Sequence, residues 1–170
     1  MNTSEVFAKL KAHALEGMVF HDEMARYFSF LSLEGYKEEQ IDHYLDETHG
    51  YRCLCNYYLD HYDALIPQTP MNRPDVIPES WYRYKRQDVD AGTKKNAVKT
   101  ALHKWEEWET ETKDLYEEMC VELLNIGEIA AEQFLKSYVK DVDCELCAIK
   151  KKLIELETVG YDITYILSQQ

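Results

Sequence analysis

Proline and glycine are scarce in this chain, and the prolines are confined to one place. The 170 residues include 4 prolines and 6 glycines, and all four prolines lie between Pro67 and Pro78. Because both residue types interrupt helices, long helices are allowed on either side of this segment. Uncharged runs are also short, and none approaches the ~18 apolar residues of a membrane-spanning helix. No phosphate-binding loop, nucleophile elbow or dinucleotide fingerprint is present, which removes the enzyme classes that depend on them.

Positive charge is in short supply as well. There are 19 basic and 32 acidic residues, so the formal net charge is −13. Such a surface repels phosphate backbones, and we expect no nucleic-acid partner. The start of the chain, Met1 to Phe7, lacks the basic and apolar regions of a signal peptide. Five cysteines without a secretion signal indicate reduced thiols, so we predict a cytoplasmic protein with no membrane partner.

Helix-stop signals divide the chain into two halves on either side of the proline segment. Ser4 is a candidate cap for the first helix, and Gly35, Gly127 and Gly160 mark later ends. We expect helices at about 4–34, 37–65, 93–124 and 128–158, with a Pro-rich crossover at 66–92 and a short C-terminal helix or tail. The length suits a single domain, 1–170. These elements predict an all-α bundle of two helical hairpins joined by one long crossover.

Polar residues interrupt the apolar stripes of these predicted helices near their middles. On the second helix the chosen stripe is Ile41, Leu45, Thr48, Arg52, Cys55, Leu59, Tyr62 and Ile66. Glu109 and Glu145 interrupt the third and fourth stripes, and Glu16 lies beside the first. Folding the hairpins back near Gly35 and Gly127 brings these charges to the same height. A buried charge without a partner is costly, so the interior needs a metal or an ion pair.

Two short segments resemble known ferritin-like proteins. Glu34-Gly35-Tyr36, followed by Gln40-Ile41 and Glu47-Thr48, is similar to the helix junction of rubrerythrins. The run from Phe134 to Val139 resembles the fourth helix of ferritins. The resemblance implies a ferritin-like four-helix bundle that forms a homo-oligomer. In that superfamily, carboxylates and Glu-x-x-His motifs from both hairpins bind two iron ions.

Carrying the resemblance over residue by residue gives an incomplete set of ligands. The metal ligands it suggests are Glu16, Glu109 and Glu145, with Glu106, Asp46 and His49 as additions. An alignment anchored at Glu47 places Arg52 and Cys55 in the second-helix ligand positions, and Ala148 stands where rubrerythrins have histidine. Carboxylate oxygens suit iron and other divalent cations. The resemblance thus implies metal-dependent oxidation, or peroxide or iron handling.

Two alternatives remain open on the sequence. In the first, the bundle is metal-free and serves interaction or assembly, and Arg52 fills the centre by pairing with Glu109 and Glu145. In the second, the thiols of Cys53, Cys55, Cys144 and Cys147 bind zinc, although such pairs usually lie on turns and these lie within predicted helices. The sequence indicates neither a catalytic residue nor a substrate.

Overall fold

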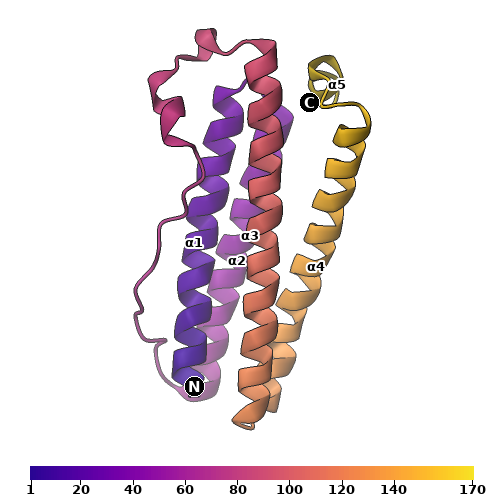
Figure 1. Cartoon of the computed structure of the whole chain (residues 1–170). Helices are drawn as coiled ribbons and strands as arrows, with labels where there is room; N and C mark the ends of the chain where they lie inside the picture. Colours follow the sequence, from indigo (N-terminus) through magenta and orange to yellow (C-terminus); the bar gives the residue numbers. More distant parts are fainter.

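The computed structural model describes residues 1–170 and is entirely helical. Its elements are α1 (Thr3–Phe30), α2 (Glu34–Tyr62), α3 (Ala91–Asn125), α4 (Ile129–Thr158) and the short α5 (Ile163–Ser168). Helices α1 and α2 pack as one antiparallel hairpin, and α3 and α4 pack as the other. Figure 1 shows the crossover running the length of the bundle from the end of α2 to the start of α3. The predicted all-α bundle of two hairpins is confirmed.

None of these helices is both long and apolar enough to cross a lipid bilayer. The long helices are amphipathic, with one face packed in the bundle and another in contact with solvent.

The ends of the first two helices differ from the sequence prediction. Asn2 caps α1, because its side chain accepts from the Glu5 N–H at 3.0 Å while the Glu5 carboxylate accepts the Asn2 N–H at 2.8 Å. Ser4, the expected cap, lies inside the first turn. The connection to α2 is also tighter than expected: Ser32 takes a left-handed conformation, with φ of 60°, and α2 already begins at Glu34. Gly35 therefore lies in the first turn of α2 rather than in the connection.

The crossover is fastened to the bundle at several points. Its Asn72 N–H donates to the Glu16 carboxylate at 2.8 Å, and the Arg73 guanidinium donates to Glu23 at 2.8 Å, both on α1. Two short 3₁₀ turns, Glu79–Arg83 and Arg86–Asp88, complete it. The Trp81 ring packs edge-on against Tyr27, 5.6 Å between centroids. The crossover thus covers the outer face of α1 and leaves α2 and α4 uncovered.

The core consists of two apolar clusters separated by a polar layer. One cluster surrounds Phe28, Leu102 and Trp105, and the other surrounds Leu10 and Met119. The buried polar residues between them are His21, Gln40, Glu109 and Thr112. The predicted stripe on α3 is buried along its whole length, and those on α1 and α4 are buried at most positions.

The predicted stripe on α2 is wrong. The buried residues of this helix are Tyr36, Gln40, Leu54 and Tyr58. Leu45 and Leu59, which were expected inside, are 56% and 44% exposed. The inward face is displaced by about one residue, or about 100° around the helix axis. This displacement changes which side chains of α2 enter the polar layer.

Candidate metal centre

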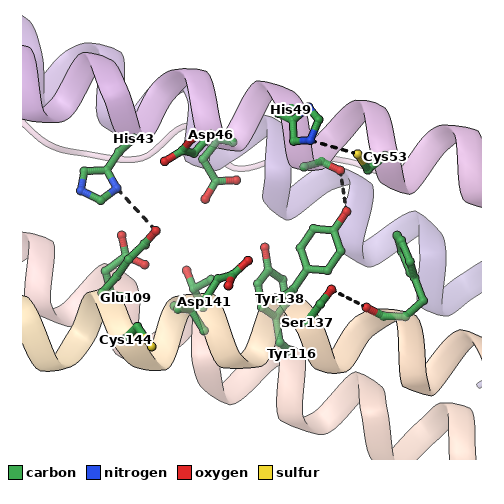
Figure 2. Close-up of a pocket in the computed structure, with 16 residues that line it drawn as sticks. His43, Asp46, His49, Cys53, Glu109, Tyr116, Ser137, Tyr138, Asp141 and Cys144 are labelled. Atoms are coloured by element: carbon green, nitrogen blue, oxygen red, sulfur yellow. Dashed lines mark hydrogen bonds and ion pairs between the residues drawn. The ribbon is translucent and has the colours of Figure 1, made fainter.

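A cavity opens between α2 and α4 at the height of the polar layer. It has a volume of about 570 Å³, and α3 forms its floor. The two hairpins meet mainly through α1 and α3, and α2 and α4 meet through side chains such as the stacked rings of Tyr57 and Phe134. Figure 2 shows the carboxylates, imidazoles and tyrosines that line the cavity from these three helices.

Three potential metal ligands converge at one end of this cavity. Atoms of His43, Asp46 and Glu145 that can bind a metal all lie within 4.8 Å of one another. His43 Nδ1 lies 3.7 Å from Glu145 Oε1, the contact drawn as a dashed line in Figure 2. Burial lowers the pKa of His43, but the hydrogen bond and charge of Glu145, aided by the charge of Glu109, outweigh this, and the net shift of the pKa is upward. Glu145 is thus the main group that favours the protonated form of the imidazole.

Glu109 lies deeper and is held by neighbours from other helices. Its side chain is 1% exposed. Trp105 Nε1 donates to Glu109 Oε1 at 3.0 Å, and His21 Nε2 lies 3.5 Å from the same oxygen. The other ring nitrogen of His21 is 2.8 Å from Gln40 Oε1, which fixes the orientation of the ring. The Glu109 carboxylate therefore has two partners in the interior.

Glu47 faces Glu109 across the bundle without any such support. It forms no hydrogen bond or ion pair in the structure, and its carboxyl group packs on α1 where Gly17 leaves space: a Cβ at Gly17 would lie 3.0 Å from Glu47 Cδ. Desolvation, and then the charges of Glu109, Glu145 and Asp46, raise the pKa of Glu47 to about 8. A carboxylate in this position lacks a cation.

Two tyrosines form the other end of the cavity. Tyr116 on α3 is 6% exposed, and its hydroxyl has no hydrogen-bond partner. Burial, followed by the charge of Glu47, raises the pKa of Tyr116 well above its usual value. The hydroxyl of Tyr138 donates to the Gly50 carbonyl at 2.8 Å, and a Cβ at Gly50 would lie 3.2 Å from the Tyr138 ring. Gly50 is three residues after Glu47, so a tyrosine of α4 fills the place where a Glu-x-x-His motif would put its imidazole.

The residues suggested by the sequence are divided between the cavity and the surface. Asp46, His49, Glu109 and Glu145 line the cavity. Glu106 instead pairs with His103 at 3.4 Å. Glu16 accepts the N–H of Asn72 in the crossover and does not line the cavity.

The two alternative sites are corrected by the structure. Arg52 is exposed and forms no ion pair, so the proposed cluster with Glu109 and Glu145 is absent. The cause is the displaced face of α2, which turns Arg52 to solvent. All five cysteines are free, and no three or more thiols gather as metal ligands. The four-thiol zinc site is therefore not formed, because α2 and α4 hold the two cysteine pairs apart.

Three residues of the site were missed. His21, His43 and Glu47 face the interior. His43 and Glu47 were missed because the more apolar stripe of α2 was taken as its buried face, and His21 on α1 was set aside because it belongs to no His-Glu-x-x-His pattern. The spacing of Tyr36, Gln40, His43, Glu47, Leu54 and Tyr58, in steps of three, four and seven, is the signal that would have found the inward face.

Fold and polar layer together define a ferritin-like four-helix bundle with a carboxylate-rich interior. A solved structure described as a humanized archaeal ferritin superposes with a TM-score of 0.80, over 98% of this chain and 91% of the ferritin chain, at 16% sequence identity. This likeness shows the fold. No family model matches the chain, and no curated protein matches its sequence.

Proposed function

We propose that this protein binds one divalent transition-metal ion, with iron as the favoured ion, between α2 and α4. His43, Asp46 and Glu145 would hold the ion, and Glu47 would complete the set from the inner side. The observation that carries this proposal is the convergence of the three ligand groups, within 4.8 Å, at the wall of a cavity open to solvent.

The donor set suits such an ion. Carboxylate oxygens favour iron and manganese, and an imidazole moves the preference further toward iron. Glu47 supports the same location, because its carboxyl group lines the cavity beside these ligands without a cation of its own. A divalent cation would relieve the mutual repulsion of Asp46, Glu47 and Glu145, since ligands of like charge gain most from a shared ion.

The proposal differs from the di-iron pattern of the superfamily. Gly50 and Ala148 occupy the two positions where the di-iron pattern has a histidine. At the level of Glu47, α1 has Gly17 in place of a carboxylate. These differences favour one ion in place of two. Glu109, held by Trp105 and His21, would orient the inner side of the site and bind the ion only weakly.

The fold also favours iron as the bound ion, because the superposed structure is named a ferritin. Bound iron would supply the electron-transfer chemistry used to reduce oxygen or peroxide. The chain itself would hold the ion with His43 and the carboxylates, and Tyr116 and Tyr138 would form the wall of the space beside it. We therefore propose oxidase, peroxide-handling or iron-handling activity as the function class.

Anaerobic calorimetric titration of metal-free protein with ferrous iron, and with manganese as a redox-stable ion, tests the binding. We expect saturation at about one ion per chain. Glu145→Gln should weaken binding at least about tenfold, since it removes a charged ligand from the set. His43 must lose its proton to bind, and its pKa is raised mainly by Glu145, so affinity should fall as the pH is lowered below neutral.

Glu157→Gln on the same helix is the matched control, because Glu157 is exposed, pairs with Lys99 at 3.5 Å and does not line the cavity. It should leave the titration unchanged. Equal loss in both variants would mean that the acidic surface, rather than the cavity, attracts the ion. Circular dichroism of each variant separates a lost site from a lost fold.

A further inference from the structure

The cavity between α2 and α4 is larger than a metal ion needs. Its volume is about 570 Å³, whereas an ion that keeps three water molecules takes up roughly 100 Å³, at about 30 Å³ for each water. Pockets of about 300–1,000 Å³ are the size that holds small organic molecules. The ligand groups of the proposed metal site converge at one end, so the unused space lies at the other. We call this part, formed by Tyr116, Tyr138 and Phe134, the tyrosine end of the cavity.

The charge of the lining decides which molecules the cavity accepts. No lysine or arginine lines it, and the only groups there that can carry a positive charge are two imidazoles, one of which belongs to the proposed metal site. Five carboxylates line it: Asp46, Glu47, Glu109, Asp141 and Glu145. A lining of this sign repels phosphates and carboxylates and attracts cations. An anionic ligand is therefore excluded.

Two hydroxyl groups at the tyrosine end have already donated their hydrogens to the backbone. Ser137 Oγ donates to the Phe134 carbonyl at 2.8 Å, and the Tyr138 hydroxyl donates to the Gly50 carbonyl at 2.8 Å. Each oxygen keeps lone pairs and can only accept from a further partner. The Asp141 carboxylate also lines this space, forms no hydrogen bond or ion pair, and is likewise an acceptor. A ligand that satisfies these groups must donate several hydrogens.

The hydroxyl of Tyr116 is an independent sign of a ligand. Tyr116 is 6% exposed, its hydroxyl has no hydrogen-bond partner, and Figure 2 shows this hydroxyl directed into the cavity. A buried hydroxyl without a partner is costly, so the group needs one. Burial, followed by the charge of Glu47, raises the pKa of Tyr116 well above its usual value. The group is therefore a neutral phenol, whose oxygen can accept an N–H from a ligand.

We propose that the tyrosine end of the cavity binds the ammonium group of a small organic amine, and that such amines are the substrate class of this site. An ammonium group carries one positive charge and three N–H donors, which match the acceptors of Asp141, Tyr116 and Tyr138. Primary alkylamines are protonated at neutral pH, as the lysine side chain is. The role of the amine as a substrate rests on the proposed function, whereas its binding does not need the metal.

The walls of the tyrosine end favour an organic cation over a second metal ion. The Phe134 and Tyr138 rings lie 5.3 Å apart between centroids, and the Tyr116 ring stands edge-on to Tyr138 at 6.0 Å. Val142 adds an aliphatic side chain to the same lining. Aromatic faces attract an ammonium group and also cover the alkyl chain attached to it. A hydrated metal ion has no apolar body to bury against these walls.

Calorimetric titration with hexylamine, hexanol and hexanoate tests the head group, because the three molecules share one chain length. In metal-free protein, hexylamine should bind at about one molecule per chain, hexanol at least about tenfold more weakly, and hexanoate not at all. Hexylamine should also bind the manganese-loaded protein, because it uses different side chains.

The outcomes separate this inference from the proposed function. Hexylamine binding by a protein that takes up no manganese would contradict the proposed function and support the amine site. Manganese binding without hexylamine binding would do the reverse. Mutual exclusion of manganese and hexylamine would overturn the inference, since the amine would then occupy the metal ligands. Equal binding of hexylamine and hexanol would overturn it too.

Two variants with matched controls locate the amine. Asp141→Asn should weaken hexylamine binding at least about tenfold. Asp143→Asn on the same helix should not, because Asp143 pairs with Lys113 at 2.6 Å and does not line the cavity. Tyr116→Phe should weaken binding about fivefold, since it keeps the ring and removes the hydroxyl. Tyr58→Phe is its control, because Tyr58 is also 6% exposed and lies outside the cavity.

Thermal melts of each variant check that the fold is kept. Hexylamine affinity that is unchanged in both Asp141→Asn and Tyr116→Phe would overturn the inference. Equal losses in Asp141→Asn and Asp143→Asn would also overturn it, because the acidic surface would then be what attracts the amine.

Discussion

Glu47 and Glu109 stand at the same height of the bundle, yet their surroundings differ in kind. Glu109 receives an indole N–H from Trp105 and faces the imidazole of His21. Glu47 has neither, and its charge lies among other carboxylates, which raise its pKa together with burial. The comparison separates a carboxylate that the fold has already satisfied from one that still needs a cation.

This difference indicates separate roles. Removing Glu109 should disturb the fold, because its partners would be left unpaired in the interior. Removing the charge of Glu47 should relieve the metal-free fold and weaken a bound metal. A site whose carboxylates all behaved alike would contradict the assignment of Glu47, rather than Glu109, to the ion.

The largest expected effect belongs to Glu109→Ala. The substitution leaves Trp105 Nε1 and His21 without their shared acceptor. A buried polar group that loses its partner lowers the free energy of unfolding by about 3 kcal/mol. Denaturant unfolding at neutral pH measures it. Glu109→Gln keeps an acceptor for Trp105, so it should lose much less. Equal losses in the two variants would show that the charge, and not the hydrogen bond, matters at this position.

Glu47→Gln should act in the opposite direction in metal-free protein. The pKa of Glu47 is about 8 in the folded chain and 4.5 in its ordinary state, so the folded chain binds more protons between these values. Wild-type stability should therefore fall as the pH rises from about 4.5 to 8 and level off above it. We expect the variant to lack this slope and to be more stable at pH 8 by about 2 kcal/mol, because solvent in the open cavity reduces the cost.

Unfolding curves of both proteins at pH 5 and pH 8, with chelator present, check this prediction. Parallel pH dependences would mean that Glu47 is not the group responsible. Added divalent metal should reverse the order of stability at pH 8, since it stabilises only the chain that binds it.

Gly17→Ala tests whether the position of the Glu47 carboxylate matters, because this carboxylate packs against Gly17 on α1. The new Cβ would lie 3.0 Å from Glu47 Cδ, so the carboxylate must move. The clash and the better helix propensity of alanine partly cancel, and stability should change by about 1 kcal/mol or less. Metal affinity should fall about tenfold, because ligand position is lost. Unchanged affinity would show that Glu47 is not a ligand. Gly92→Ala, where the added Cβ meets only Asp90 at 3.6 Å, is the control.

The smallest effect is expected for Arg52→Ala. Its side chain is exposed and unpaired in the single chain, so the free energy of unfolding should change by about 0.5 kcal/mol or less at low protein concentration. A loss of several kcal/mol under those conditions would restore Arg52 to the interior and remove the present assignment of the α2 face.

Three of the four long helices were predicted well because their buried faces are also their most apolar faces. On α3, the positions from Val98 to Leu123 alternate by helical spacing, and Glu109 is a single exception within them. Its burial could be predicted because apolar residues precede and follow it on the same face. The same argument located Glu145 near the centre of α4, where it is partly exposed at the cavity wall.

Helix α2 could not be predicted in this way, because its inner face is polar where it lines the cavity. Gln40, His43, Glu47 and Gly50 occupy that face, while leucines occupy the outer one. Hydrophobic patterning selects the more apolar face, and here that face is turned outward. Neither the crossover contact of Glu16 nor the position of Tyr138 could be foreseen, because both depend on how separate segments meet in space.

The unequal seams between the hairpins have a mechanical consequence. On one side, the Trp108 ring stacks between His13 and Phe20, with centroid separations of 4.7 and 4.8 Å, and ties α1 to α3. On the other side, α2 and α4 are joined at separate points around the cavity, among them the Tyr138 hydroxyl on the Gly50 carbonyl and the stacked rings of Tyr57 and Phe134. Widening this side of the bundle would leave every hydrogen bond within the helices intact but would break the one between Tyr138 and Gly50. We therefore expect the exchange of the cavity's contents to depend on that single hydrogen bond.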